Sequence, residues 1–166
     1  MRYLVKDGES MRELGRAIAP VLRAGDLVIL AGGLGAGKTT LVQGIGAGMR
    51  VRGQVASPTY IISRAHEPAE EGPWLVHVDA YRLGSLAELD HLDLDESTGE
   101  AVTVVEWGEG TAESLADGHA LITIDRARGA FTEGDDPAAG ERVVTISTSG
   151  DAWQGRQWPQ VEGGSR

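Results

Sequence analysis

Residues 32–39 constrain the fold more than any other part of this chain. They read Gly-Gly-Leu-Gly-Ala-Gly-Lys-Thr, which matches the phosphate-binding loop pattern G-x-x-x-x-G-K-S/T. An apolar run, residues 27–30, precedes them, and a helix-like stretch, residues 39–49, follows. A buried strand before the loop and a helix after it are the context that the pattern needs. The sequence therefore predicts an α/β fold with a site for a nucleoside triphosphate.

Each residue type in this loop suits an anion. Glycines adopt positive φ and leave backbone N–H groups free to face phosphate oxygens, and the start of the next helix adds a partial positive charge. Lys38 supplies a charge for the β and γ phosphates, and the Thr39 hydroxyl can bind the accompanying Mg²⁺. The chain has thirteen arginines but only two lysines, Lys6 and Lys38. A glycine-rich turn with an incidental surface lysine is therefore the disfavoured interpretation.

Composition excludes several other classes of protein. The 166 residues suffice for one domain of ordinary size. Cysteine is absent, so there is no disulfide, thiol nucleophile or cysteine-bound metal, which fits a reducing compartment. No apolar run approaches a bilayer span, and the N-terminus lacks a signal-peptide core. The net charge of −10 argues against a broad nucleic-acid-binding surface. We expect a cytoplasmic protein without membrane or DNA partners, and any RNA to be held by another protein.

Strand-like and helix-like segments alternate through the first half of the chain. Residues 2–5 are predicted to form a strand, and a capping box at residues 10–13 predicts the start of a helix that ends near Gly25. Further strands are predicted at residues 27–30, 59–65, 74–79, 102–106, 120–125 and 142–147. This order favours a three-layer P-loop NTPase fold with a mixed, mainly parallel central sheet.

The end of the chain differs in composition from the rest. Residues 1–148 account for the predicted domain, whereas residues 149–166 are rich in Gly, Gln and Pro. We predict a flexible C-terminal tail here. Its two tryptophans, Trp153 and Trp158, either fold back on the body, which is the favoured interpretation, or dock on a partner.

Two acids compete for the metal and the hydrolytic water. Asp79 follows four residues of buried-type strand at 75–78, and Glu106 follows a similar strand at 102–105. This is the form that a metal-binding acid takes in P-loop proteins. An acid at the C-terminal end of a parallel strand faces the crevice where ligands bind. From the residues alone either acid could lie beside the loop, or be a strand-ending surface residue. The turn at residues 57–60, Ser-Pro-Thr-Tyr, could sense a γ phosphate or be only a turn.

Four motifs together resemble the TsaE family of bacterial ATPases. They are Gly-Gly-Leu-Gly-Ala-Gly-Lys-Thr-Thr at 32–40, Ser-Pro-Thr-Tyr at 57–60, His-Val-Asp-Ala-Tyr-Arg at 77–82 and Glu-Trp at 106–107. The resemblance covers roughly residues 1–147. It implies an enzyme that binds ATP, ADP and Mg²⁺ and works with TsaD and TsaB proteins. Together they would sustain threonylcarbamoyl transfer to the tRNA adenosine next to the anticodon, while the TsaE-like chain is not itself the transferase.

The resemblance also implies roles for individual residues. Thr39 and Glu106 match the Mg²⁺ ligands, and Asp79 matches an acid that is needed for activity. Lys38 completes the implied catalytic set. One departure is Gly33, where the family usually carries an acid. The implied nucleotide-binding residues are Gly33, Leu34, Gly35, Ala36, Gly37, Lys38, Thr39, Thr40, the aromatic Trp107 and, by a loose match, Arg142.

A slow, partner-stimulated ATPase is the favoured activity. P-loop hydrolysis is slow without a stabilising arginine, and nothing in the sequence aims Arg64 or Arg82 at a γ phosphate. A regulatory GTPase is disfavoured because the chain contains no asparagine for the Asn-Lys-x-Asp element. Two alternatives remain open. A small-molecule kinase would use residues 126–128 in a lid, and a nucleotide-dependent adaptor would scarcely hydrolyse ATP.

Overall fold

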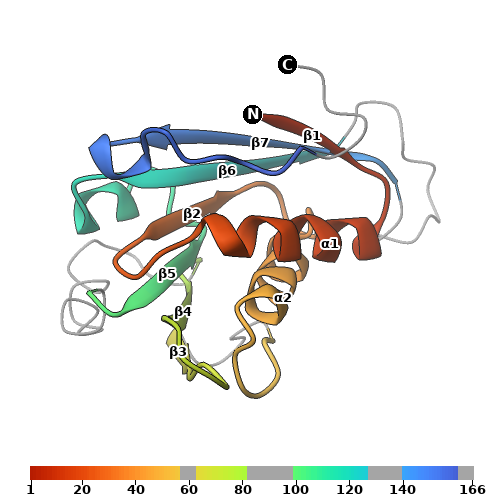
Figure 1. The fold of residues 1–166 in the computed structure, drawn as a ribbon. Helices are drawn as coiled ribbons and strands as arrows, with labels where there is room; N and C mark the ends of the chain where they lie inside the picture. The colour runs from red at the N-terminus through yellow and green to blue at the C-terminus, as the bar shows by residue number, and fades with distance from the viewer. Residues whose placement is uncertain (57–62, 82–98, 127–139, 161–166) are drawn as a thin grey trace.

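A seven-stranded sheet organises the computed structural model, which describes residues 1–56, 63–81, 99–126 and 140–160. The strands lie in the order β1-β7-β6-β2-β5-β4-β3 (Figure 1). Their bounds are β1 Arg2–Val5, β2 Leu27–Ala31, β3 Ser63–His66, β4 Trp74–Asp79, β5 Ala101–Glu106, β6 His119–Arg126 and β7 Arg142–Ser149. The helices are α1 Gly8–Ile18 and α2 Lys38–Gly48, with short 3₁₀ turns η1 Ala19–Val21, η2 Ala112–Leu115 and η3 Asp151–Trp153.

The centre of the sheet is parallel and its edges are antiparallel. Strands β4, β5, β2 and β6 run parallel to one another. Strand β3 is antiparallel to β4, β7 to β6, and β1 to β7. The sheet is mixed, as the sequence predicts, and its centre is parallel. Because β2, β4 and β5 are parallel, their C-terminal ends share one edge of the sheet, beside the loop that leads into α2.

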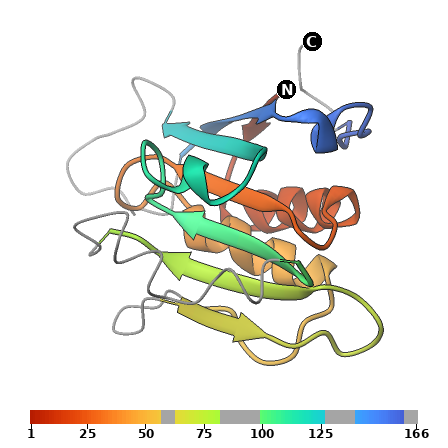
Figure 2. The same ribbon diagram turned by 90° about the vertical axis from the view of Figure 1, so that its left-hand side faces the viewer.

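The central strands are buried on both faces. Every residue of β2 and of β5 is buried, as expected for parallel strands covered on two sides. Helices α1 and α2 both lie on one face of the sheet, behind it in Figure 2. The segment around η2 packs against the other face, where Ala112 and Leu115 meet side chains such as Ile29 and Val105. Among the described residues, no helix is long and apolar enough to cross a membrane.

The two helices approach each other through glycines. A Cβ added to Gly44 of α2 would lie 2.3 Å from the Arg12 carbonyl oxygen of α1. A Cβ on Gly15 of α1 would lie 2.5 Å from the Leu41 carbonyl oxygen. Since real Cβ atoms do not tolerate such distances, only glycine allows this helix separation at both positions. The contact fixes the position of α2, whose N-terminus follows the glycine-rich loop.

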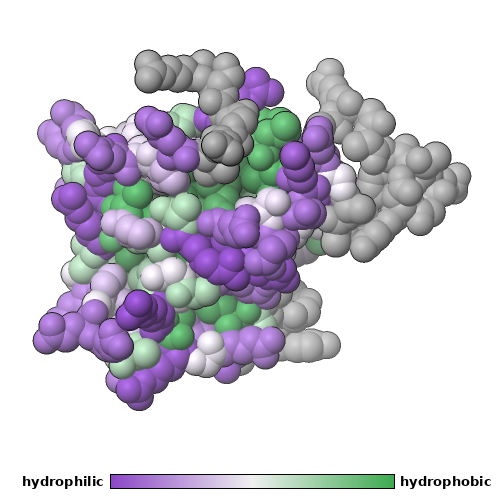
Figure 3. Space-filling view, turned by 45° about the vertical axis from the view of Figure 1, so that its right-hand side comes forward, coloured by the Kyte–Doolittle hydropathy of each residue, from purple (hydrophilic) through white to green (hydrophobic). Residues whose placement is uncertain are grey.

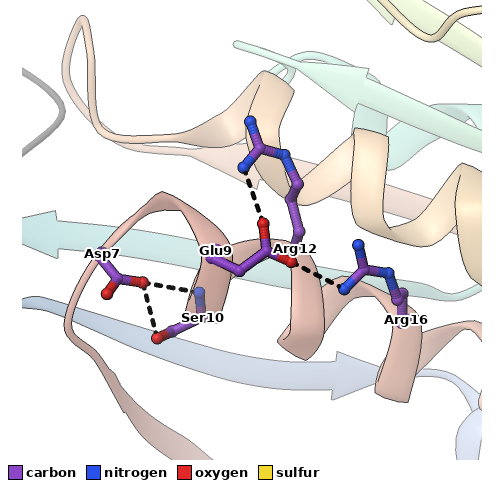
Figure 4. Close-up of polar contacts among 5 residues, drawn as sticks. All are labelled: Asp7, Glu9, Ser10, Arg12 and Arg16. Atoms are coloured by element: carbon purple, nitrogen blue, oxygen red, sulfur yellow. Dashed lines mark hydrogen bonds and ion pairs between the residues drawn. The ribbon is translucent and has the colours of Figure 1, made fainter.

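The outer side of α1 is charged. The face drawn in Figure 3 carries hydrophilic side chains at its centre, with smaller hydrophobic areas around them. Glu9 pairs with Arg12 at 3.2 Å and with Arg16 at 3.1 Å (Figure 4). These side chains are exposed, so each pair contributes little to stability. Arg12 and Arg16 follow Glu9 by three and seven residues, so all three lie on one side of α1, and their exposure shows that this side faces solvent.

Helix α1 begins three residues before the predicted capping box. Asp7 is its N-cap, and its Oδ1 accepts both the backbone N–H and the hydroxyl of Ser10 at 2.8 Å (Figure 4). These bonds, the backbone one first, hold the pKa of Asp7 below its ordinary value. Ser10 is thus a donor inside the helix, and its predicted role as the cap is wrong. The carboxylate is the better cap because it can accept from both donors at once.

The segment after β7 folds back on the body. Trp153 is 3 % exposed and belongs to the main core, and Trp158 stacks on it with ring centroids 6.0 Å apart. The side chain of Arg156 forms a buried ion pair with Asp26. The tryptophans thus fold back on the body, as the favoured interpretation predicts, and the described residues 150–160 of the tail segment 149–166 pack against the domain. Apolar and charged anchors outweigh the Gly, Gln and Pro content of the segment.

Candidate functional site

The glycine-rich loop joins the buried end of β2 to the start of α2. Gly32 has φ of 143°, and a Cβ there would lie 2.6 Å from the Ile124 carbonyl oxygen. Gly37 has φ of 107° and is the N-cap of α2. Left-handed geometry at this cap turns the chain directly into the helix, so the first N–H groups of α2 face the loop. Backbone N–H groups arranged in this way form an anion-binding site.

Lys38 lies inside the loop. Its side chain is buried, and Nζ donates to the carbonyl oxygens of Gly32 at 2.8 Å and Gly33 at 2.9 Å. The ammonium also lies 3.7 Å from the centroid of the Trp107 ring, a favourable cation–π contact. Burial lowers the pKa of Lys38, while the carboxylates of Glu106 and Asp79 act in the opposite direction. The loop therefore contains one positive charge between backbone carbonyls and two acids.

Glu106 is the acid that contacts the start of α2. Its Oε1 accepts a hydrogen bond from the Thr39 hydroxyl at 2.9 Å. The same oxygen lies 2.7 Å from Nε2 of His77, which is fully buried on β4. Glu106 itself is 3 % exposed. A buried carboxylate is thus held by a hydroxyl from α2 and an imidazole from the neighbouring strand.

Asp79 lies beside Glu106 but has different partners. The two acids are opposite each other in the parallel register of β4 and β5. Asp79 is only partly buried, and its Oδ1 accepts the backbone N–H of Tyr81 at 3.0 Å. In the residues alone both acids were candidates for the metal. The structure distinguishes the two acids, because the Thr39 hydroxyl donates its hydrogen bond to Glu106.

Trp107 follows Glu106 with a backbone that is rare for a bulky residue. Its φ is 61°, and its N–H donates to the Leu30 carbonyl oxygen at 3.0 Å. Positive φ in such a residue costs energy and persists where the surroundings enforce it, commonly at functional sites. The indole lies over the ammonium group of Lys38, and its centroid is 5.1 Å from the centroid of the Tyr81 ring. It forms an aromatic wall beside the loop.

Two arginines contact the backbone of the loop. Arg142 is buried at the start of β7, and its Nε donates to the Ala36 carbonyl oxygen at 2.9 Å. Arg126 ends β6 and donates from Nη2 to the Gly35 carbonyl oxygen at 3.1 Å. The resemblance loosely matches Arg142 to a residue near the nucleotide, and in the structure Arg142 contacts the backbone of the loop. Arg64 is exposed on β3.

The residues at Thr39 and Glu106 fit a magnesium ion. Mg²⁺ prefers oxygen ligands and is usually bound through one or two carboxylates, substrate phosphates and water. A hydroxyl oxygen and a carboxylate 2.9 Å apart, at a helix N-terminus, supply such a donor set. Within the described residues there is no cluster of three or more His, Cys, Asp or Glu side chains that could hold a metal. The donor set therefore suits an ion that arrives with phosphates.

The structure brings most of the predicted site residues to one edge of the sheet. The loop residues Leu34, Gly35, Ala36 and Gly37 lead into Lys38, Thr39 and Thr40 of α2, with Asp79, Glu106, Trp107 and Arg142 around them. Leu34 is 90 % exposed at the loop. The Ser-Pro-Thr-Tyr turn, Arg82 and the lid candidate after Arg126 lie outside the described residues. His77 was missed, although its spacing of two from Asp79 on a strand places both on one face.

The chain has the mixed α/β fold of the P-loop NTPases, with the site at the glycine-rich loop. A family model for TsaE, the threonylcarbamoyl adenosine biosynthesis protein, matches residues 5–132. The chain therefore belongs to the TsaE family, and its role lies in tRNA threonylcarbamoyladenosine biosynthesis.

Relatives from several bacteria support this membership. The tRNA threonylcarbamoyladenosine biosynthesis protein TsaE of Streptomyces coelicolor is 54 % identical over 144 residues, which are 86 % of this chain and 93 % of the relative. The TsaE protein of Mycobacterium leprae is 50 % identical over 69 % of this chain and 76 % of its own length. The crystal structure of YdiB from Bacillus subtilis matches with a TM-score of 0.67 and 28 % identity, over 93 % of this chain and 88 % of that one.

Proposed function

We propose that this protein is an Mg²⁺-dependent ATPase that binds and slowly hydrolyses ATP. With TsaD-like and TsaB-like proteins it would support threonylcarbamoylation of the adenosine adjacent to the anticodon in tRNA. The observation that carries the proposal is the 2.9 Å contact between Thr39 and the buried Glu106 at the end of the glycine-rich loop. Membership of the TsaE family supports the pathway.

The residues of the loop bind and orient the triphosphate. Backbone N–H groups of residues 33–37 and of the first turn of α2 face the phosphate oxygens, and Lys38 exchanges its loop carbonyl contacts for the β and γ phosphates. Thr39 and Glu106 would hold the metal ion. When bound, Mg²⁺ would neutralise charge on the phosphates and favour in-line attack. Trp107 keeps bulk water away from Lys38.

Asp79 is assigned to the attacking water. Its carboxylate lies at the same strand edge as Glu106 but outside the Thr39 contact, so it can orient a water molecule without displacing the metal ligand. The water oxygen bonds to the γ phosphorus while the bond to the β–γ bridging oxygen breaks. ADP and inorganic phosphate are the products.

We expect slow turnover by the isolated chain, and the arginines that the structure describes beside the loop support this expectation. Arg126 and Arg142 both donate to carbonyl groups of the loop backbone, so these contacts hold the loop. An arginine aimed at the γ phosphate can accelerate P-loop hydrolysis by roughly a thousandfold or more. We therefore expect the TsaD-like and TsaB-like partners to stimulate turnover, and tRNA to take part through the assembly.

Reconstitution tests this proposal. Formation of threonylcarbamoyladenosine in tRNA would be measured with the TsaD-like and TsaB-like proteins, ATP and either the wild type, Glu106→Ala or Asp79→Ala. Product that requires the wild-type chain and is lost in both variants supports the proposal. Product formed equally with the variants would favour the adaptor alternative. A phosphorylated small-molecule acceptor among the products would favour the kinase.

A further inference from the structure

A buried histidine on β4 contacts the carboxylate assigned to the metal. We infer that His77 is a positioning residue that holds Glu106 in the orientation that binds Mg²⁺. The inference rests on the proposed function, since it concerns the same metal site. Nothing in the sequence motif distinguishes this histidine from an ordinary core residue of a buried strand, so the argument depends on its contacts.

The contact is short, buried and directional. Nε2 of His77 lies 2.7 Å from Oε1 of Glu106, and the two side chains are 0 % and 4 % exposed. An ionised carboxylate only accepts hydrogen bonds, so Nε2 carries the hydrogen. Among the residues that the structure describes, Nδ1 of His77 has no hydrogen-bond partner. Among the described residues, the hydrogen bond of this imidazole ring is therefore the one to Glu106.

The two donors on Glu106 occupy the same oxygen. Oε1 accepts from both Thr39 Oγ1 and His77 Nε2, which leaves Oε2 for the ion or for water bound to it. Thr39 itself is assigned to the metal, so its hydroxyl must serve two partners when Mg²⁺ is present. His77 has no such second task. His77 is therefore the donor that can hold Oε1 of Glu106 in place both with and without bound Mg²⁺.

The sheet holds the imidazole rigidly. His77 and Asp79 are on the same face of β4, and β4 pairs in parallel register with β5, where Asp79 is opposite Glu106. The imidazole thus reaches Glu106 from a neighbouring strand, where His77 pairs with Val104, two residues before Glu106. A donor mounted on a central strand loses little entropy when it orients its partner. Such outer contacts to metal ligands commonly change metal affinity 10–100-fold when removed, as a rough guide.

A matched set of variants tests the role. In His77→Gln the amide nitrogen can reach the position of Nε2 and still donate to Glu106. In His77→Asn the side chain is one methylene shorter and cannot reach, and His77→Leu removes the donor altogether. Gln and Asn are both polar amides, so they carry similar burial costs. Thermal unfolding and circular dichroism would establish which variants fold.

Mg²⁺-dependent ADP binding is the readout. Calorimetric titrations with ADP across a series of Mg²⁺ concentrations, and in EDTA, separate metal binding from nucleotide binding. We expect Leu and Asn at position 77 to raise the half-maximal Mg²⁺ concentration about 10–100-fold, with Gln nearer to wild type. ADP affinity in EDTA should be nearly unchanged in all of them, whereas a general loss of structure would weaken it too.

The outcomes distinguish the inference from the proposed function. A wild-type chain whose ADP affinity does not respond to Mg²⁺ would contradict the proposed function. A wild-type response that persists unchanged in His77→Asn and His77→Leu would overturn the inference alone. If Leu does not fold, the Asn and Gln pair still decides, because equal Mg²⁺ dependence in those two variants would contradict a positioning role.

Discussion

Replacing Arg156 by alanine is expected to destabilise the fold strongly, although this residue lies in a segment that composition alone suggests is flexible. Its side chain is 4 % exposed and pairs with Asp26, which is 6 % exposed. Nη2 lies 2.8 Å from Oδ1 of Asp26, and Nη1 also donates to the Val21 carbonyl oxygen at 3.0 Å. The guanidinium further lies 4.2 Å from the centroid of the Trp153 ring.

The magnitude follows from what truncation leaves behind. Asp26 keeps one donor, the backbone N–H of Arg23 at 2.6 Å, but loses its counter-charge while still buried. Removing one partner of a buried ion pair costs about 3–5 kcal/mol. For a domain of this size each kcal/mol lowers Tm by roughly 2–4 °C, so Arg156→Ala should lower Tm by about 6–20 °C.

Calorimetry and urea unfolding would measure the effect. Arg50→Ala is the matched control, because its ion pair with Glu70 is 74 % and 73 % exposed and should contribute little. The double variant Asp26→Ala/Arg156→Ala should recover part of the loss, since no uncompensated charge remains. A loss in Arg156→Ala no larger than in Arg50→Ala would refute the reasoning.

Three further changes probe the helix contact, the second acid and the helix cap. Gly44→Ala should lower Tm by several degrees, because the added Cβ would lie 2.3 Å from a carbonyl oxygen of α1. Gly99→Ala is the control and should leave Tm unchanged, because an added Cβ there would meet no atom within 4 Å. Equal Tm values for the two variants would contradict the close helix contact. Asp79→Asn should slow ATP turnover without changing ADP affinity, and weaker ADP binding would instead place Asp79 among the binding residues. Asp7→Ala should lower Tm at neutral pH but not in strong acid. The backbone N–H of Ser10 lowers the pKa of Asp7 in the folded state, so the stabilisation is present above the unfolded pKa and lost as pH falls through the folded one; a pH-independent difference in Tm would contradict this.

The strands and the loop could be predicted because their signals are local. Strand β2, and the residues before the final acids of β4 and β5, are apolar except for His77 and Thr103, which suits strands buried in a parallel sheet. The loop pattern needs a strand before it and a helix after it. The start of α1 was misplaced because Asp7 and Ser10 are both good caps, and only the structure shows which of them accepts. The fold of residues 150–160 depends on partners distant in sequence, such as Asp26 for Arg156.

Some residues of the site could likewise be predicted from the sequence, and others depend on the fold. Asp79 and Glu106 could be found from the sequence because each acid ends a buried-type strand. Their different surroundings depend on strand order, which places β5 beside β2 and so brings Glu106 to Thr39. His77 was missed because its spacing of two from Asp79 indicates a shared face of the strand but does not indicate a contact with Glu106. Its contact with Glu106 depends on the pairing of β4 with β5.

The measurement that tests the central claim most directly is phosphate release from ATP by the isolated chain, with and without Mg²⁺, for the wild type and for Glu106→Gln. This change keeps the shape of the side chain and removes its charge. The account predicts slow release by the wild type that requires Mg²⁺, and loss of that release in the variant, with both proteins folded. Release that is independent of Mg²⁺, or equal in the two proteins, would contradict the assignment of Thr39 and Glu106 as the metal site of an ATPase.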